Sequence, residues 1–166
     1  MGLLNWRKLE EHFGTDSEYL GFLRDSPSAA QRLCHVLSNS RFLGDALNKS
    51  VESVTWLGSD NDLQPRSRES LDVQTHASLE RNAGSINDFA NSIRAMRRHE
   101  IERIGLGWMS GVIDDKASLA GMTDVYDAAI DASLTWAIRH QTQEMGLDEA
   151  PAAIAVIGMG RYGGRE

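Results

Sequence analysis

Helix start signals recur along most of this chain, and they limit its fold more than any other feature. Five serines each stand before a predicted helix, polar after Ser67 and with apolar side chains at helical spacing in the other four, and only three prolines occur in 166 residues. A serine at the N-cap accepts a hydrogen bond from a free backbone amide of the first turn, which favours a helix there. The pattern predicts a mainly α fold up to residue 146. The five serines are Ser26, Ser40, Ser50, Ser67 and Ser85.

Residues 1–58 are predicted to form a subdomain of short helices joined by tight turns. Asn5 and Asp16 are expected to cap the first two helices. Ser26 followed by Pro27 is a strong start signal, because proline fits the first helical position, where no backbone N–H is needed. Short amphipathic helices of this kind bury their apolar faces only by packing on each other.

Cys34 is the one cysteine of the chain, so an internal disulfide is impossible. It lies in an apolar run and is expected to be a buried, structural thiol rather than a reactive one. A chain without disulfides fits a reduced, cytoplasmic setting. No apolar run reaches 18 residues and no signal peptide opens the chain, so no membrane association is expected. The helical face assigned to this run holds Ala30, Leu33, Cys34 and Leu37.

The composition is that of an ordinary globular domain, with 41% hydrophobic and 25% charged residues. A length of 166 residues is enough for a real hydrophobic core. The net charge of -7 argues against nucleic acid as a partner, since a phosphate backbone attracts basic surfaces.

Residues 67–146 are predicted to form a second helical region around two long antiparallel helices. Residues 58–66 have loop composition and mark the boundary before it. Apolar side chains recur at a helical period after Ser85 and again after Leu119, and Gly146 is expected to end the second helix. Such stripes should pack on each other. Four tryptophans are expected to lie in helical cores: Trp6, Trp56, Trp108 and Trp136.

A charged segment on the first long helix has two interpretations. It is a solvated face with weak ion pairs at helical spacing, or a basic stripe that faces a phosphate or a partner domain. The residues alone favour the solvated face. The segment contains Arg94, Arg97, Arg98, His99, Glu100, Glu102 and Arg103.

The C-terminal residues carry the strongest chemical signal. Residues 152–157, Ala-Ala-Ile-Ala-Val-Ile, are predicted to form a buried strand, and a glycine-rich turn with two arginines follows. Such a turn suits phosphate, because glycine permits close approach of backbone N–H groups and arginine adds charged donors. The spacing Gly158-x-Gly160-x-x-Gly163 also matches the dinucleotide fingerprint, but neither the helix nor the acid that this fingerprint needs follows it.

Residues 154–166, Ile-Ala-Val-Ile-Gly-Met-Gly-Arg-Tyr-Gly-Gly-Arg-Glu, resemble the start of the catalytic motif of the glutamine synthetase adenylyltransferase family. That motif is a strand followed by Gly-Met-Gly-(Lys/Arg)-x-Gly-Gly-x-Glu. Residues 95–105 are similar to an arginine-rich helix that the family carries before this motif, and residues 23–57 are similar to its upstream helical segment. The resemblance covers most of the chain and is closest at its end.

The resemblance implies a nucleotidyltransferase of the DNA polymerase β type, with residues 152–166 as the first strand and glycine turn of its core. It assigns phosphate contacts to Gly160, Arg161, Gly163 and Gly164. The family's Ser-Asp-x-Asp, which binds catalytic Mg²⁺, would lie beyond Glu166, so no catalytic or metal-binding residue is assigned within this chain. The chain is accordingly expected to be a piece of a longer protein and inactive by itself.

The family's reaction is transfer of AMP from ATP to a tyrosine of glutamine synthetase, or its removal, in nitrogen regulation. The resemblance is closer to the second, adenylylating half than to the first. It implies glutamine synthetase and a PII-type regulatory protein as partners. A helical interaction module without catalysis remains the alternative, and in either case exposed apolar surface is expected to favour self-association.

Overall fold

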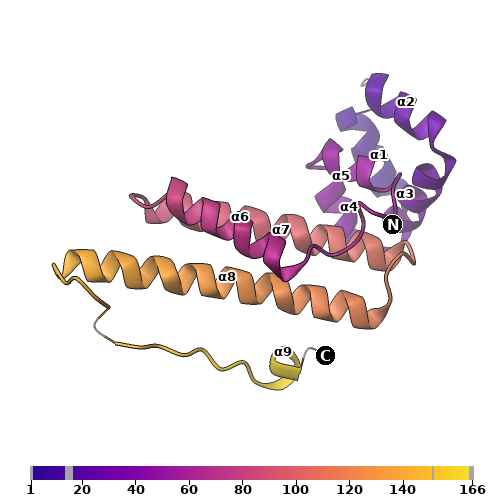
Figure 1. The fold of residues 1–166 in the computed structure, drawn as a ribbon. Coiled ribbons are helices and arrows are strands. Elements are labelled where there is room, and N and C mark those ends of the chain that lie inside the picture. The colour runs from indigo at the N-terminus through magenta and orange to yellow at the C-terminus, as the bar shows by residue number, and fades with distance from the viewer. Residues whose placement is uncertain (1, 14–16, 151, 165–166) are drawn as a thin grey trace. The chain divides into compact units, whose positions relative to one another are not determined.

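The computed structural model describes residues 2–13, 17–150 and 152–164, which are mainly helical and contain no strand (Figure 1). They divide into two compact units, Met1–Pro65 with Ile101–Ser118 and Arg66–Glu100 with Leu119–Glu166. None of the described helices is both long enough and apolar enough to cross a membrane. The helices are α1 (Gly2–Phe13), α2 (Ser17–Asp25), α3 (Pro27–Asn39), α4 (Arg41–Leu47), α5 (Val51–Trp56), α6 (Arg68–Arg81), α7 (Ile86–Met109), α8 (Asp115–Glu144) and α9 (Gly160–Gly164).

A serine stands before the first turn of five of these helices at the predicted positions, and four of the five cap their helix through the side chain. The Ser40 hydroxyl accepts a hydrogen bond from the Leu43 amide at 3.1 Å, and equivalent bonds of 3.3–3.4 Å form at Ser50, Ser67 and Ser85. Ser26 makes no side-chain cap bond, and α3 begins instead with Pro27 in its first turn. Asp16, the predicted cap of α2, lies outside the described residues.

Asn5 was expected to cap α1, but it lies inside that helix and is only 2% exposed. Its side-chain amide donates to the backbone carbonyl of Leu37 at 3.0 Å. Leu37 is near the end of α3, where backbone carbonyls lack partners within the helix. The prediction was wrong because a distant acceptor satisfies this amide. The core around it consists of Leu9, Tyr19, Ala29, Leu33, Val36, Leu37, Leu43, Leu47, Val54, Trp56, Leu57, Leu63 and Leu106.

Cys34 is exposed, which corrects the predicted buried thiol. The buried face of α3 holds Ala29, Leu33, Val36 and Leu37, so it is centred away from Cys34. The expectation for tryptophan holds for only two of the four. Trp56 and Trp136 are buried, whereas Trp6 and Trp108 are exposed. Trp108 points its ring N–H at the Asp115 carboxylate, 2.7 Å away, which satisfies its polar atom at the surface.

In the second unit, small and aromatic side chains of α8 form the buried face. The ring of Trp136 stacks on Phe89 of α7, with ring centroids 5.8 Å apart. α8 begins at Asp115, earlier than the apolar pattern indicates, because the Asp114 carboxylate accepts from the Ala117 amide at 2.7 Å and caps the helix. Gly146 has a φ of +64° and follows the end of α8, as predicted. The buried residues of α8 are Gly121, Thr123, Val125, Ala128, Ala129, Ala132 and Trp136.

The charged segment of α7 is not one solvated face. Arg94, Arg97 and Arg98 are exposed. Glu100 is buried and forms an ion pair with Arg66 at 3.1 Å. Arg103 is buried too, with its guanidinium 4.1 Å from the centroid of the Trp56 ring. It also donates to the backbone carbonyl of Asp62. Its role here is structural, since the stack and the bond fix the loop before α6 to α7.

Candidate functional site

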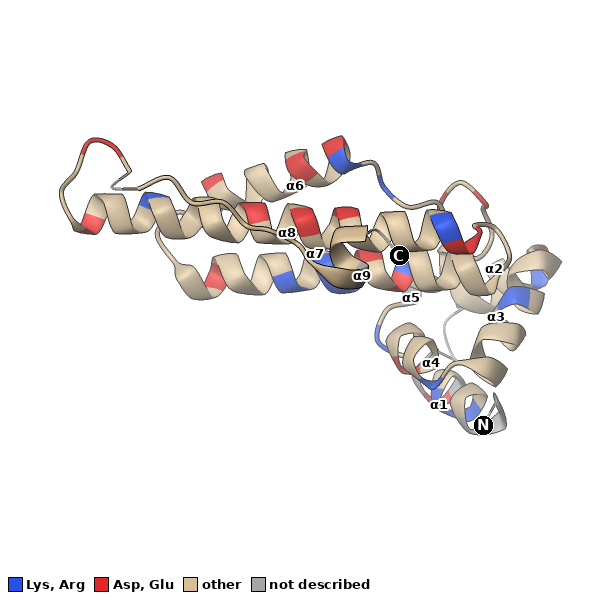
Figure 2. Ribbon diagram, turned by 90° about the horizontal axis from the view of Figure 1, so that it is seen from below, with Lys and Arg blue, Asp and Glu red and all other residues tan. Residues whose placement is uncertain are grey.

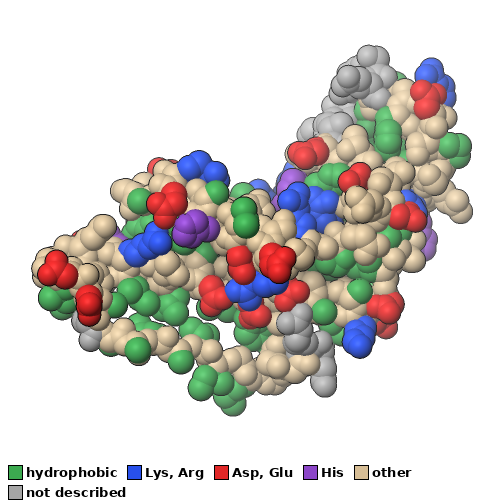
Figure 3. Space-filling model, in the orientation of Figure 1, with side chains coloured by type: hydrophobic (Ala, Val, Ile, Leu, Met, Phe, Trp, Pro, Cys, Tyr) green, Lys and Arg blue, Asp and Glu red, His purple; other side chains and the backbone are tan. Residues whose placement is uncertain are grey.

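The predicted strand at residues 152–157 does not form. Residues 153–159 have no regular structure and run alongside α8 before the chain turns into α9, as two views show (Figure 1, Figure 2). A strand needs a neighbour to accept and donate its backbone hydrogen bonds, and the described residues offer none. Hydrophobic side chains consequently lie exposed along this segment (Figure 3), and Ile157 and Met159 are each 81% exposed.

The glycine turn that follows has a packed side, at Gly158 and Gly163, and an open side, at Gly160. At Gly163, a Cβ would lie against the carbonyl oxygen of Gly158, far inside the 3.0 Å that real Cβ contacts keep. At Gly158, a Cβ would meet the Tyr162 ring at 2.8 Å. Gly160 has a φ of +66°, and a Cβ there would meet nothing within 4 Å. Glycine is therefore needed at Gly163 for space and at Gly160 for its backbone conformation.

The structure brings three of the four predicted phosphate residues together. Gly160, Gly163 and Gly164 belong to the single turn of α9. The side chain of Arg161 lies outside the described part of the chain, and so do Arg165 and Glu166. Gly158 and Tyr162 were not assigned to the site from the sequence, although both stand inside the glycine motif.

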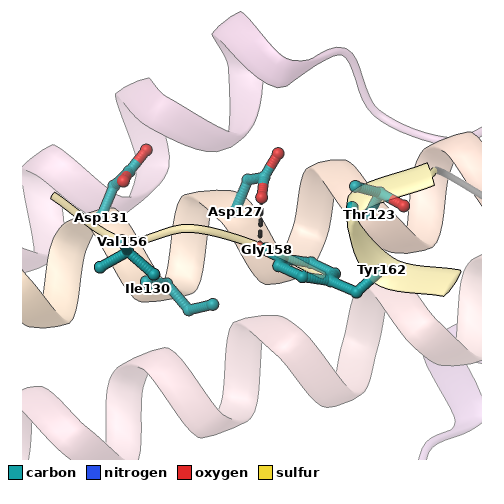
Figure 4. A pocket seen from close by; sticks show the side chains of 8 residues that line it. Thr123, Asp127, Ile130, Asp131, Val156, Gly158 and Tyr162 are labelled. Atoms are coloured by element: carbon teal, nitrogen blue, oxygen red, sulfur yellow. Dashed lines mark hydrogen bonds between the residues drawn. The ribbon is translucent and has the colours of Figure 1, made fainter. Parts of the chain in front are cut away.

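A cavity of about 330 Å³ lies between the packed side of this turn and α8 (Figure 4). Figure 4 shows Tyr162 reaching across to Asp127, with Ile130 and Val156 beside them. Two carboxylates one helical turn apart make the α8 wall acidic, because positions 127 and 131 share a face. The lining residues are Thr123, Asp127, Ile130, Asp131, Val156, Gly158, Tyr162 and Gly163.

An ion-pair network holds this wall. The Tyr162 hydroxyl donates to Oδ1 of Asp127, while Arg68 of α6 lies 3.5 Å from Oδ2 of the same carboxylate. Arg68 also pairs with Asp131 and with Asp72, the latter at 2.7 Å. The hydrogen bond to Asp127 is the main cause that raises the pKa of Tyr162 to about 12, with desolvation adding to it. The phenol is therefore a neutral donor near pH 7.

Aromatic contacts hold the Tyr162 ring from a second direction. The Tyr126 ring meets it edge-on, with centroids 6.4 Å apart. The guanidinium of Arg97, on α7, lies over the Tyr126 ring, 5.9 Å from its centroid. An exposed arginine of α7 thus reaches the wall of the site through an aromatic ring rather than through an anion.

These described residues do not fit a magnesium site. Mg²⁺ requires near-octahedral oxygen ligands, and no group of three or more acidic, histidine or cysteine side chains suited to a metal occurs in the part of the chain described. Oδ1 and Oδ2 of Asp127 are already engaged by Tyr162 and Arg68. The acidic wall also repels phosphate, so the open side at Gly160 is the only face of the turn that suits such an anion among the described residues.

Comparison with known proteins gives a family for the whole chain. A family model described as glutamate-ammonia ligase adenylyltransferase matches residues 30–166. A bifunctional glutamine synthetase adenylyltransferase/adenylyl-removing enzyme of Bifidobacterium longum (strain DJO10A) is 76% identical over 166 residues, which is 100% of this chain and 15% of that protein. The proteins of the same name from Leifsonia xyli and Mycobacterium leprae are 39% and 36% identical, over 99% of this chain and 16% of their own lengths.

The chain thus spans about 15% of the length of the first of these curated relatives. No solved structure matches it. The family match extends over far more than half of the sequence, from within α3 through the glycine turn. The chain therefore belongs to the glutamate-ammonia ligase adenylyltransferase family.

Proposed function

We propose that this chain is a segment of an enzyme that transfers AMP from ATP to a tyrosine of glutamine synthetase, or removes it, in nitrogen regulation. The relatives carry both activities in their name, and the protein of Bifidobacterium longum (strain DJO10A) aligns with all 166 residues of this chain. The observation that carries the proposal is the glycine turn at Gly158–Gly164. Its residues match the family's catalytic motif, and its backbone has the crowded and open positions that explain why glycine stands there.

In the full-length enzyme, residues 152–157 would be the first strand of a polymerase-β-type nucleotidyltransferase sheet. The unpaired backbone and the exposed Ile154, Val156 and Ile157 support this, because a parallel sheet buries apolar side chains on both faces. We assign the segment to the adenylylating half. ATP and Mg²⁺ belong to the proposal, but the metal ligands would come from the rest of the enzyme, since the described acids do not fit them.

The chain's own contribution would be to bind and orient phosphate. Backbone N–H groups at the open side of the turn can approach an anion closely beside Gly160, where no side chain intervenes. Arg161 would add a charge-assisted contact. Gly163 would keep the turn tight, because a side chain there would push the Gly158 carbonyl away. Each of these residues would act by positioning the phosphate or by balancing its charge, and these are the two main ways in which a protein speeds the transfer of a nucleotidyl group.

The proposed partner of the full-length enzyme is glutamine synthetase, with a PII-type protein as regulator, in the cytoplasm. A non-catalytic interaction module is a second candidate, favoured by the exposed apolar side chains of residues 154–159. The same surface would make the separate 166-residue chain self-associate. In the enzyme this surface would be covered by the remaining strands.

Transfer of labelled AMP from ATP to glutamine synthetase tests the proposal. The full-length enzyme is expected to label glutamine synthetase, and the separate 166-residue chain is expected not to, since its described residues form no metal site. If the separate chain binds glutamine synthetase tightly and full-length protein labels nothing, the interaction module is the better account. Labelling by the separate chain at the rate of the full-length enzyme would show that the catalytic centre is misplaced.

A further inference from the structure

We propose that Asp127 is a positioning residue for the glycine turn: its bond to Tyr162 fixes the packed side of the turn to α8 and so directs the open side at Gly160 toward the nucleotide. This inference rests on the proposed function and names a residue that acts through Tyr162 rather than on the substrate. It connects a helix remote in sequence, 35 positions before Tyr162, with the phosphate-binding backbone.

The geometry at Asp127 is that of a fixed acceptor. One carboxylate oxygen accepts from the Tyr162 hydroxyl, and the other faces Arg68 at 3.5 Å. Arg68 is itself held by Asp72 and Asp131 on two different helices. A carboxylate engaged at both oxygens has little rotational freedom, so the position of the Tyr162 hydroxyl is set by α6 and α8 together.

The turn responds to this bond because Tyr162 is packed into it. The Tyr162 ring occupies the space where a side chain at Gly158 would lie. Gly163, the next residue after Tyr162, lies so close to the Gly158 carbonyl that no Cβ would fit between them. A shift of the Tyr162 ring therefore moves both ends of the Gly158–Gly163 loop. Small misplacements of a positioning loop cost large factors in rate.

The charge at this wall excludes a different role for Asp127. A carboxylate that contacts phosphate directly would repel it. Here Asp127 lies on the packed side with Arg68 beside it, while the nucleotide side is open at Gly160. The wall thus supports the turn from behind, and Figure 3 shows basic side chains enclosed by acidic ones on this part of the surface.

The test is a double-mutant cycle in the full-length enzyme, with Tyr162→Phe, Asp127→Ala and both together. Each single change should lower kcat/KM for ATP in AMP transfer about tenfold, with KM for glutamine synthetase unchanged. The double variant should be no worse than either single one, because both remove the same contact. Asp127→Asn should retain more activity than Asp127→Ala, since an amide oxygen still accepts from a phenol.

Asp148→Ala is the matched control for Asp127→Ala. It also removes one carboxylate, but from an exposed position after the end of α8 and outside the cavity lining, so it should change kcat/KM for ATP by less than about twofold. The adenylyl-removing activity of the same variants reports on whether the enzyme still folds, and it should stay unchanged. Effects on AMP transfer that add up in the double variant, or that accompany equal losses in the removing activity, would overturn the inference.

Gly163→Val distinguishes a failure of the positioning role of Asp127 from a failure of the proposed function. If it abolishes AMP transfer while Tyr162→Phe and Asp127→Ala do not affect it, the positioning role is wrong and the proposed function stands. If Gly163→Val transfers AMP normally, the turn is not the phosphate site and the proposed function itself fails.

Discussion

Replacing Gly107 by Ala should destabilise the first unit, although alanine favours helices. Gly107 lies in the last turns of α7 and is buried. A Cβ there would press on the backbone carbonyl oxygen of Leu63, far inside 3.0 Å, and would also touch Ile113 at 3.4 Å. The carbonyl cannot retreat easily, because the neighbouring Asp62 carbonyl accepts a hydrogen bond from buried Arg103.

Two effects of opposite sign decide the magnitude. Alanine gains up to about 1 kcal/mol of helix propensity over glycine. Overpacking against a fixed backbone costs about 1–3 kcal/mol. The net expectation is a loss of up to about 2 kcal/mol in the free energy of unfolding. For a chain of this size that lowers Tm by up to about 8 °C.

Gly21→Ala is the matched control with the opposite sign. Gly21 lies inside α2 of the same unit, and a Cβ there would meet nothing within 4 Å. The same substitution should therefore raise the free energy of unfolding by about 0.5–1 kcal/mol, through propensity alone. Urea unfolding followed by tryptophan fluorescence measures both. The packing argument would be refuted if Gly107→Ala stabilised the unit as much as Gly21→Ala does.

Two further predictions concern charged and polar contacts. Arg103→Lys should lower the free energy of unfolding by about 1–2 kcal/mol, because lysine loses the planar stack on Trp56; urea unfolding checks this, and an unchanged midpoint would contradict it. The pKa of Tyr162 is about 12, above the ordinary 10.0, so its bond contributes stability that is fully present below pH 10.0 and lost as pH rises to about 12. Asp127→Asn should lower that pKa, as phenolate absorbance would show, and an unchanged titration would contradict the bond.

The parts of the fold that the sequence predicts are those decided within a few residues. Ser40, Ser50, Ser67 and Ser85 cap helices because the acceptor and its amide lie three positions apart. Gly146 follows the end of α8 because only its own backbone conformation matters. These features need no knowledge of the partner elements, so local chemistry suffices.

The features that could not be predicted from the sequence depend on partners far away along the chain. Asn5 is inside α1 because the Leu37 carbonyl, 32 positions away, takes its amide hydrogen. Cys34 is exposed because packing centred the buried face of α3 elsewhere. The strand at 152–157 requires neighbouring strands that the described residues do not supply.

The candidate site divides in the same way. Its glycines could be predicted from the motif, and the backbone of Gly160 and the crowding at Gly163 explain two of them. The contacts that form its α8 wall could not be predicted. The bond between Tyr162 and Asp127 and the clamp by Arg68 join three helices, and nothing in the local spacing of these residues predicts that they meet.

The most direct test of the account is AMP transfer by the full-length enzyme carrying Gly163→Val. A β-branched side chain at this position would displace the Gly158 carbonyl and block the approach of phosphate. The account predicts loss of labelled AMP transfer from ATP to glutamine synthetase, with the far-UV circular dichroism unchanged. Transfer at the rate of the unmodified enzyme would contradict the central claim that this glycine turn holds the nucleotide.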